Sequence, residues 1–186
     1  MAGFSYNGNQ CLAGNSYCFT NTGTTGAVYA WDFGDGVGTS TAENPCYTYT
    51  GSGSFIVTQS VMLGACSDAA FTIVVIYDSI AASIVGTDAT CNGDCDGAAN
   101  LTVASGQAPF SYLWSNGPTT EDVTGLCAAT YDVTVTDANS CQAIVSVVIS
   151  EPTVLTATPS GNNILCNGAC TGDATATGGG GTSPYS

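Results

Sequence analysis

The residues of this chain best suited to chemistry are its ten cysteines, because the sequence has no histidine, lysine or arginine. Thiolates bind zinc, and Cys91 and Cys95 have a spacing close to that of a zinc knuckle. Without histidine, a zinc site here would consist of thiolates alone. Cytosolic proteins rarely keep so many thiols, whereas small exported β domains commonly depend on disulfides. We therefore predict disulfides, with zinc as the alternative.

Two pairs of aspartates form the other candidate site. Asp32 and Asp35 flank a glycine, and Asp94 and Asp96 flank Cys95. Oxygen-rich turns can hold Ca²⁺, but Asp also stabilises turns through hydrogen bonds from its own side chain. Neither pair resembles an EF-hand loop, so we favour turns and keep calcium as the alternative. We expect no other cofactor.

Catalysis has little support in this composition. Paired carboxylates occur in glycosidases, but few other charged residues are present to shift the pKa of such a pair. A serine nucleophile needs a base, and histidine, the usual base, is absent. We predict that the chain is not an enzyme.

All side-chain charge is negative, from fourteen Asp and Glu residues in a chain of 186. Charged residues make up 8% of the chain, against about 25% in typical domains. Nucleic-acid binding and polybasic docking to lipid both need cations, so we expect neither. No signal peptide follows Met1, and no apolar run approaches the roughly 20 residues of a membrane helix. Either an export signal lies outside this segment, or Met1 is not the native start.

Short runs of alternating apolar and polar residues must position these side chains. Such runs, separated by turn-forming residues, are typical of β-strands, and helical periodicity is almost absent. Tyr131, Val133 and Val135, for example, fall on one face of a strand and their polar neighbours on the other. The expected strands are 28–33, 55–62 and 70–76 in a first domain, and 99–104, 110–114, 130–136 and 142–149 in a second.

The two domains share a layout. Tyr29 and Trp31 place two aromatic rings on one strand face, and Tyr112 and Trp114 do the same in the second domain. A glycine turn follows each pair, and a cysteine lies further along. A tryptophan on a central strand with a downstream cysteine is typical of immunoglobulin-like sandwiches. We expect these aromatics to be core residues.

A sequence repeat of constant period follows. The motif at Cys91 recurs at Cys166, and Pro109 recurs at Pro184, so that both offsets are 75 (166 − 91 and 184 − 109). The chain stops inside this further copy. We therefore expect an all-β chain of tandem immunoglobulin-like β-sandwich modules, held by disulfides, with the last module incomplete. The expected domains are 1–77, 78–152 and 153–186.

Residues 4–76 resemble the PKD domain, an immunoglobulin-like β-sandwich. The resemblance rests on the runs Tyr29 to Gly36, Asn44 to Tyr49 and Gly53 to Val57. Cys46 departs from the family pattern and indicates an additional disulfide.

Residues 90–152 resemble the SprB repeat of gliding-motility adhesins from Bacteroidetes. This family usually has glycine where Ala129 and Ser140 stand. The resemblance rests on Cys91-Asn-Gly, Asp96-Gly97, the run from Pro109 to Gly117, Leu126, the run from Tyr131 to Cys141, and Glu151-Pro152.

The two resemblances imply a large secreted protein of the cell surface, often exported by the type IX system. The expected function is that of a stalk or spacer in adhesion or gliding motility, partnered by neighbouring repeats or by copies of itself in a filament. One alternative is a polysaccharide-binding module that uses exposed aromatics such as Tyr17, Tyr47 and Tyr49. Another is an accessory region of a secreted hydrolase. We also expect glycosylation sites at Ser79 and, in an N-linked sequon, at Asn100.

The cysteines fall into four per domain, which allows three connectivities in each. Cys91 and Cys141 lie near the two ends of the second domain, and Cys11 and Cys66 take the corresponding outer positions in the first. We predict that these outer pairs close each domain around an inner pair. The predicted pairs are Cys11–Cys66, Cys18–Cys46, Cys91–Cys141 and Cys95–Cys127, with Cys166 and Cys170 unpaired within this segment.

Overall fold

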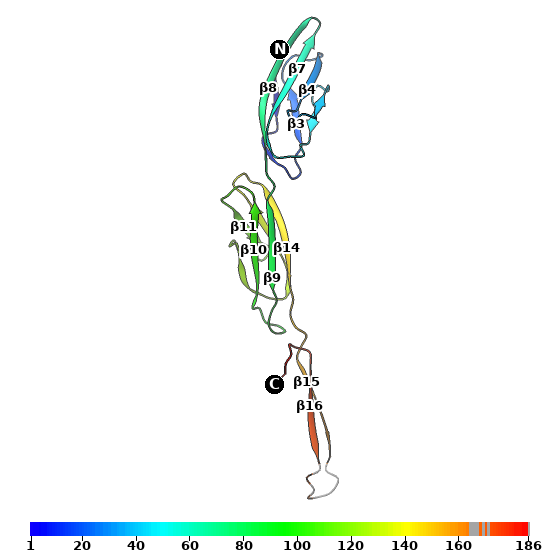
Figure 1. Cartoon of the computed structure of the whole chain (residues 1–186), viewed down its shortest axis with the longest axis vertical. Helices are drawn as coiled ribbons and strands as arrows, with labels where there is room; N and C mark the ends of the chain where they lie inside the picture. The colour runs from blue at the N-terminus through cyan, green and yellow to red at the C-terminus, as the bar shows by residue number, and fades with distance from the viewer. Residues whose placement is uncertain (164–167, 169, 171, 186) are drawn as a thin grey trace. The chain divides into compact units, whose positions relative to one another are not determined.

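The computed structural model describes residues 1–163, 168, 170 and 172–185. It divides into two compact units, and each is described by itself. Unit 1 contains Met1–Ala81, Val103–Phe110 and Val135–Ala143, and unit 2 contains Ala82–Thr102, Ser111–Thr134 and Ile144–Ser186. In the described part of the chain every regular element is a β-strand (Figure 1). None of the described residues belongs to a helix that is long and apolar enough to cross a membrane.

The first eight strands form two facing sheets, which we call the first sandwich. One sheet has the order β1-β3-β6 and the other the order β2-β8-β7-β4-β5. The strands are β1 (Phe4–Tyr6), β2 (Gln10–Cys11), β3 (Tyr17–Asn21), β4 (Val28–Asp32), β5 (Thr39–Ser40), β6 (Cys46–Tyr47), β7 (Gly53–Leu63) and β8 (Cys66–Tyr77).

Aromatic rings fill the space between the two sheets of the first sandwich. In β4, alternation buries Tyr29 and Trp31 and exposes Val28, Ala30 and Asp32, as expected for a strand with one face in the core. Phe19 of β3 lies on the opposite sheet, and its ring centroid is 5.6 Å from that of Trp31. The Trp31 indole Nε1 donates to the Ala42 carbonyl at 2.8 Å, so its polar atom is also paired. The predicted core role of Tyr29, Trp31 and Trp114 is confirmed, whereas Tyr112 is only half-buried.

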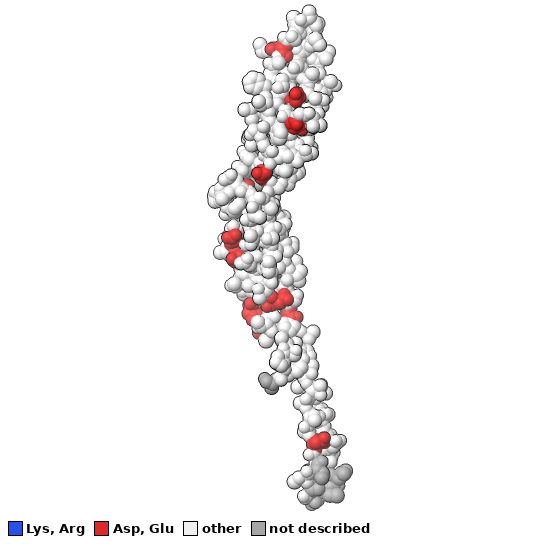
Figure 2. All heavy atoms as spheres, in the orientation of Figure 1, with Lys and Arg blue, Asp and Glu red and all other residues white. Residues whose placement is uncertain are grey.

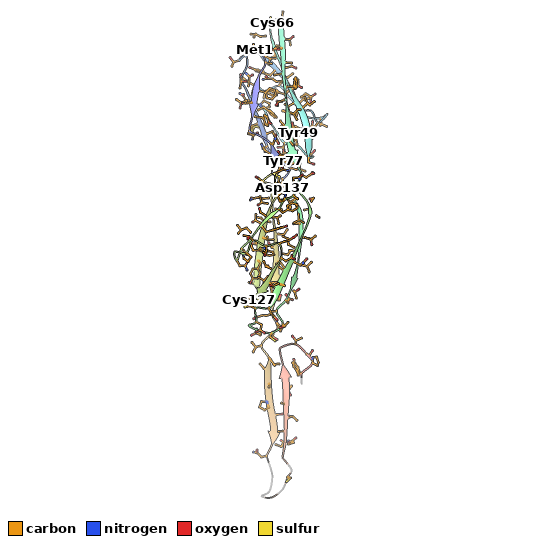
Figure 3. All side chains as sticks on the ribbon, turned by 90° about the vertical axis from the view of Figure 1, so that its left-hand side faces the viewer. Met1, Tyr49, Cys66, Tyr77, Cys127 and Asp137 are labelled. Atoms are coloured by element: carbon orange, nitrogen blue, oxygen red, sulfur yellow. A yellow bond between two sulfur atoms is a disulfide. The ribbon has the colours of Figure 1, made fainter. Side chains whose placement is uncertain are left out.

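The β7–β8 hairpin is the longest element of the first sandwich (Figure 1). Its antiparallel register runs from Gly53 opposite Ile76 to Leu63 opposite Cys66. Cys66 therefore lies at the tip of the hairpin, and Tyr77 lies at the far end of the same strand (Figure 3).

Strands β9 to β14 form the second sandwich, again from two sheets. Their orders are β12-β10-β9 and β11-β13-β14. The predicted alternation in β13 is confirmed, because Val133 and Val135 are fully buried and the residues beside them are not. The strands are β9 (Ala81–Thr87), β10 (Gly97–Ser105), β11 (Ser111–Trp114), β12 (Val123–Leu126), β13 (Ala129–Thr136) and β14 (Gln142–Ile149).

The further copy of the repeat begins as a two-stranded antiparallel hairpin. It consists of β15 (Thr156–Asn162) and β16 (Asp173–Gly179), which we call the terminal hairpin. Both ends of β15 follow the corresponding ends of β9 by one repeat period (156 − 81 and 162 − 87). The sequence period therefore reappears as a period in the positions of the strands.

Candidate functional site: the disulfides and the Cys11 joint

Three disulfides provide the covalent cross-links of the described chain. Cys18–Cys46 and Cys95–Cys127, both predicted as inner pairs, are present with Cα atoms 4.0 Å and 3.9 Å apart. Each inner pair spans a short stretch of sequence, 28 and 32 residues respectively. Each therefore closes a loop inside its own sandwich.

The two predicted outer pairs, Cys11–Cys66 and Cys91–Cys141, are wrong. The structure instead joins Cys11 to Cys141, with Cα atoms 5.6 Å apart and a sequence separation of 130. Cys66 and Cys91 are free and exposed.

The reason for the first error is strand length. Cys11 pairs in parallel with Tyr77, whereas Cys66 begins the same strand, β8. At about 3.3 Å per residue the two ends of β8 are on the order of 35 Å apart, and a disulfide needs Cα atoms within about 7 Å.

The second error has the same cause in β14. Cys141 directly precedes β14, and Cys91 lies in a turn tied to Glu151, beyond the other end of that strand. An eight-residue strand separates its ends by about 25 Å. Of the two cysteines predicted to be unpaired, Cys170 is free and exposed, and Cys166 lies outside the described residues.

The Cys11–Cys141 bond lies in unit 1 at a place that we call the Cys11 joint, made of Cys11, Tyr77, Gln107, Asp137 and Cys141. Strand β2 holds Cys11 beside the end of β8, where the Leu12 amide donates to the Tyr77 carbonyl at 2.8 Å. The chain leaves β8 at Tyr77 and begins β9 at Ala81. The disulfide therefore lies next to the peptide connection between the two sandwiches.

A buried tyrosine fixes the position of β2. The Tyr17 hydroxyl accepts a hydrogen bond from the Gln10 amide at 2.7 Å and donates one to the Val75 carbonyl at 2.6 Å. Burial raises the pKa of Tyr17, although the bond from Gln10 partly opposes this. The neutral hydroxyl can therefore act as donor and acceptor at once, which places Cys11 at a defined point on β8.

Asp137 organises the turn that presents Cys141. Its Oδ1 accepts hydrogen bonds from the amides of Asn139 and Cys141, both at 2.9 Å, and its Oδ2 accepts one from the Gln107 amide at 3.1 Å. Asp137 and Cys141 are both buried. Asp137 was not among the predicted site residues. The available signal was its place at the head of the turn-forming run Asp137-Ala-Asn-Ser-Cys141.

A shallow cavity of about 270 Å³ opens beside the joint. Its lining includes Tyr77, Asp78, Gln107 and Asp137, and Figure 3 shows Tyr77 and Asp137 close to each other. The lining is mainly polar and includes no free thiol. The chemistry that the described residues show at the Cys11 joint is therefore the Cys11–Cys141 disulfide itself.

The first aspartate pair is used in turn hydrogen bonds. Asp32 Oδ1 accepts from the Gly34 amide at 2.8 Å. Asp35 Oδ1 accepts from the amides of Val37 and Gly38, and its Oδ2 accepts from the Tyr47 hydroxyl. Burial by itself raises the pKa of Asp35, but these hydrogen bonds outweigh it and lower the pKa below its ordinary value.

The second aspartate pair is also part of a turn. Asp96 accepts from the amide and the hydroxyl of Thr90, and these bonds lower the pKa of Asp96. Asp94 donates its amide to the Cys91 carbonyl at 3.2 Å. Among the described residues no three carboxylate or thiol side chains gather as a metal site would require. The contacts favour the interpretation of both pairs as turn stabilisers.

The aromatics expected to bind polysaccharide are not free platforms. Tyr17 and Tyr49 are 0% and 2% exposed, so the prediction that they are exposed is wrong. Tyr47 is half-buried and stacks on Phe33 with ring centroids 4.2 Å apart. All three pack in or against the core of the first sandwich, Tyr17 from β3, Tyr47 from β6 and Tyr49 from the residues that follow β6.

The two predicted glycosylation sites differ in accessibility. Ser79 is half-buried in the connection between β8 and β9, and its carbonyl accepts from the Ser105 hydroxyl at 2.9 Å. Asn100 is exposed, and its amide donates to Asp122 at 3.3 Å. Glycosylation at either residue remains a prediction.

Comparisons with known structures bear on the fold. The chain resembles the C-terminal 282-residue fragment of intimin, crystallised with the intimin-binding domain of its translocated receptor, at a TM-score of 0.55 and 14% identity, over 84% of this chain and 66% of that one. It also resembles the three N-terminal domains of the Hoc capsid protein of bacteriophage RB49, at a TM-score of 0.37 and 15% identity, over 98% and 70%. This chain thus spans just under two thirds of the intimin fragment. A search of curated proteins by sequence finds no match.

Two family profiles match the sequence directly, the PKD domain over residues 3–76 and the SprB repeat over residues 83–119. Such modules are typical of non-catalytic structural regions. Together with the disulfides, they point to an extracellular or cell-surface protein of adhesin-like type. The chain therefore carries a PKD domain followed by an SprB repeat.

Proposed function

We propose that this chain is a non-catalytic stalk or spacer of a secreted cell-surface adhesin or filament, acting in adhesion or gliding. The observation that carries the proposal is the Cys11–Cys141 disulfide, which connects residues 130 positions apart. Cys11 lies in the matched PKD region, and Cys141 lies between β13 and β14 of the second sandwich.

A spacer has to transmit force from one module to the next. A single peptide connection would do so through residues 78–80 alone. The Cys11–Cys141 bond adds a second covalent path at the same place, since Cys11 lies beside Tyr77. Under tension, force that enters at the N-terminus can pass through the disulfide and bypass the intervening chain.

The surface chemistry is also that of a spacer. Acidic side chains are scattered over the face shown in Figure 2, and the sequence has no cation to pair with them. Net charge of one sign favours solubility. The proposed partners are neighbouring repeats or copies of the same chain, and the proposed route to the surface is type IX secretion.

The polysaccharide-binding alternative loses support because Tyr17 and Tyr49 belong to the core. The accessory role beside a secreted hydrolase has no described residue in its favour. Neither alternative explains why a disulfide should connect the two sandwiches.

Single-molecule extension tests the proposal. In the native chain, the disulfide should shield the 130 residues between Cys11 and Cys141 from force. The double variant Cys11→Ser/Cys141→Ser keeps both inner disulfides, so about 70 of these residues (130 − 28 − 32) should extend and release about 24 nm of additional contour length at 3.3–3.6 Å per residue. Cys66→Ser, which removes a free exposed thiol, is the matched control and should extend like the native chain. Equal contour lengths for the native chain and the double variant would contradict a joint that carries force through the disulfide.

A further inference from the structure

The environment of the free thiol of Cys91 repeats that of Cys11. Cys11 lies beside Tyr77, where the chain leaves β8. Next to Cys91, the Asn92 amide donates to Glu151 at 2.7 Å and to the Pro152 carbonyl at 3.1 Å, where the chain leaves β14. The separation between Tyr77 and Pro152 (152 − 77) equals one period of the repeat.

The next strand begins at the same distance beyond each exit. Strand β9 begins at Ala81, four residues after Tyr77 (81 − 77), and β15 begins at Thr156, four residues after Pro152 (156 − 152). Each cysteine therefore lies next to residues that lead into a copy of the same strand. Cys11 lies next to Tyr77 before β9, and Cys91 adjoins Asn92, which contacts Pro152 before β15. Cys11 has a partner there, and Cys91 is free.

The partner of Cys11 comes from a turn anchored to Gln107. The Ala138 amide donates to the Gln107 carbonyl at 2.9 Å, and the Gln107 amide donates to Asp137. Residue 182, a threonine, corresponds to Gln107 (107 + 75). The further copy includes Thr182, but its described residues end at Tyr185, which corresponds to Phe110 (185 − 75). No described residue of that copy corresponds to the Asp137 turn.

A cavity lies beside Cys91 at this position. It encloses about 770 Å³ within unit 2, and its lining includes Cys91, Pro152, Gly181, Thr182 and Tyr185. Gly181 and Thr182 correspond to Gly106 and Gln107, which contact or adjoin the Cys141 turn at the Cys11 joint. The cavity is thus next to the residues on which that turn would be anchored in a complete copy.

We propose that Cys91 is the attachment point for a following SprB repeat and forms a disulfide with the cysteine of that repeat that corresponds to Cys141. Each repeat would then receive one disulfide from the module before it and supply one to the module after it. Cys95–Cys127 would remain the bond inside each repeat. The inference deepens the proposed spacer function and rests on it, because it extends one covalent joint to a series.

The bond forms by ordinary thiol–disulfide exchange. The Cys91 thiolate attacks a small disulfide such as oxidised glutathione, which releases one reduced glutathione. The second thiolate then displaces the other glutathione from the mixed disulfide. Two protein thiols are oxidised, and one glutathione disulfide is reduced to two thiols.

The test is a chain in which a copy of residues 112–152 follows Ser186, which corresponds to Ser111 (186 − 75) and so completes the further repeat. The copy carries Gln142→Asn as a mass tag, because that residue is exposed. The protein is reoxidised with glutathione and cleaved on both sides of each cysteine under non-reducing conditions. We expect a peptide in which Cys91 is joined to the tagged copy of Cys141, and loss of Cys91 from the alkylated free thiols.

Two substitutions separate this pairing from random oxidation. Cys66→Ser removes another exposed free thiol and should leave the Cys91 bond unchanged. Cys91→Ser should leave the tagged cysteine free. A second chain, in which residues 78–152 are duplicated directly after Pro152, repeats the test with two complete native repeats in case the first extension does not fold.

The native disulfides in the same peptide map are the folding control. If Cys11–Cys141 and Cys95–Cys127 are found while Cys91 stays free, or pairs with Cys95 or Cys170 in both chains, the inference is overturned and the spacer proposal stands. If Cys11–Cys141 itself is missing from the folded native chain, the spacer proposal fails first.

Discussion

The two sandwiches obtain their stability in different ways. The first buries six aromatic side chains, which are Tyr17, Phe19, Tyr29, Trp31, Phe33 and Tyr49. Within the described residues, the second buries a single aromatic side chain, Trp114, among smaller residues such as Val133, Val135 and Ile149. Large rings bury the most apolar surface per residue and make favourable edge and stacked contacts. The first core is therefore redundant, whereas the second depends on one side chain.

The cross-links are nearly equal in the two sandwiches. Cys18–Cys46 closes 28 residues and Cys95–Cys127 closes 32, so the chain-entropy contribution of each is about 3.5 kcal/mol. Cross-links of nearly equal strength therefore support the larger core of the first sandwich and the smaller core of the second. We therefore expect the second sandwich, rather than the first, to rely on its disulfide to stay folded. The chain has only two tryptophans, one in each core, and each reports on its own sandwich.

The largest expected effect is that of Trp114→Ala. Removing a fully buried tryptophan costs about 3–5 kcal/mol, and the carbonyl of Thr120 also loses the indole donor at 2.9 Å. We expect the second sandwich to unfold while Trp31 fluorescence reports a first sandwich of native stability. Trp31→Ala is the matched variant and should leave a weakened but folded first sandwich, because Phe19 and Phe33 remain packed together. Urea titrations followed by far-UV circular dichroism measure both variants, because each lacks the tryptophan of its own sandwich. Equal outcomes would remove the difference between the cores.

Removing the inner disulfides should have the next largest effect. Cys95→Ser/Cys127→Ser and Cys18→Ser/Cys46→Ser should each cost about 3.5 kcal/mol in the free energy of unfolding. Because the starting stabilities differ, we expect the first double variant to lose its fold at a moderate urea concentration and the second to retain it. The fluorescence of Trp114 and of Trp31, respectively, measures this. A second sandwich that tolerates the loss as well as the first would show that its core is sufficient alone.

A smaller effect should distinguish the first sandwich in acid. The pKa of Asp35 in the folded chain lies below its ordinary value, so ionised Asp35 stabilises the fold above that ordinary value, and this contribution is lost as the pH falls through the folded pKa. Asp35→Asn should reduce stability by about 1–2 kcal/mol at neutral pH. The difference from the native chain should shrink as the pH falls below the ordinary pKa of aspartate and should vanish only below the lowered pKa of folded Asp35.

Asp32→Asn is the control for this measurement, because Asp32 accepts one turn hydrogen bond, whereas Asp35 accepts three. Thermal unfolding of the first sandwich, followed by Trp31 fluorescence between pH 2 and 7, gives both curves. A constant difference between native chain and Asp35→Asn across this range would mean that ionisation of Asp35 has no part in the effect.

The smallest effect concerns the turn before Cys141. Ser140 has a φ of 65°, in the left-handed region that favours glycine. This explains why the SprB family usually has glycine there. Ser140→Gly should stabilise the turn by roughly 0.5–1 kcal/mol and should accelerate reoxidation of the Cys11–Cys141 bond. Ser115→Gly, in an exposed turn elsewhere in the repeat, is the control and should not change that rate.

Much of the fold could be predicted from the sequence, but the described strands β1, β3, β9, β12, β15 and β16 were missed as well as the shortest ones. The seven predicted strands are all present, because each is long enough to show alternation, as β7 and β14 do. Strands β2, β5 and β6 have two residues each, too few for any period to appear, and they form only because a longer strand offers them hydrogen bonds. Their absence from the prediction mattered, since β2 carries Cys11.

The all-β class, the period of the repeat and the use of disulfides follow from local sequence pattern and composition, which do not depend on how the strands pair. The partner of Cys11 and the burial of Tyr17 and Tyr49 do not. They depend on which strands pair and in which register, and a register connects residues far apart in the chain. Cys11 lies beside Tyr77 rather than Cys66 because β2 pairs with the last residues of β8, and only the folded structure decides that.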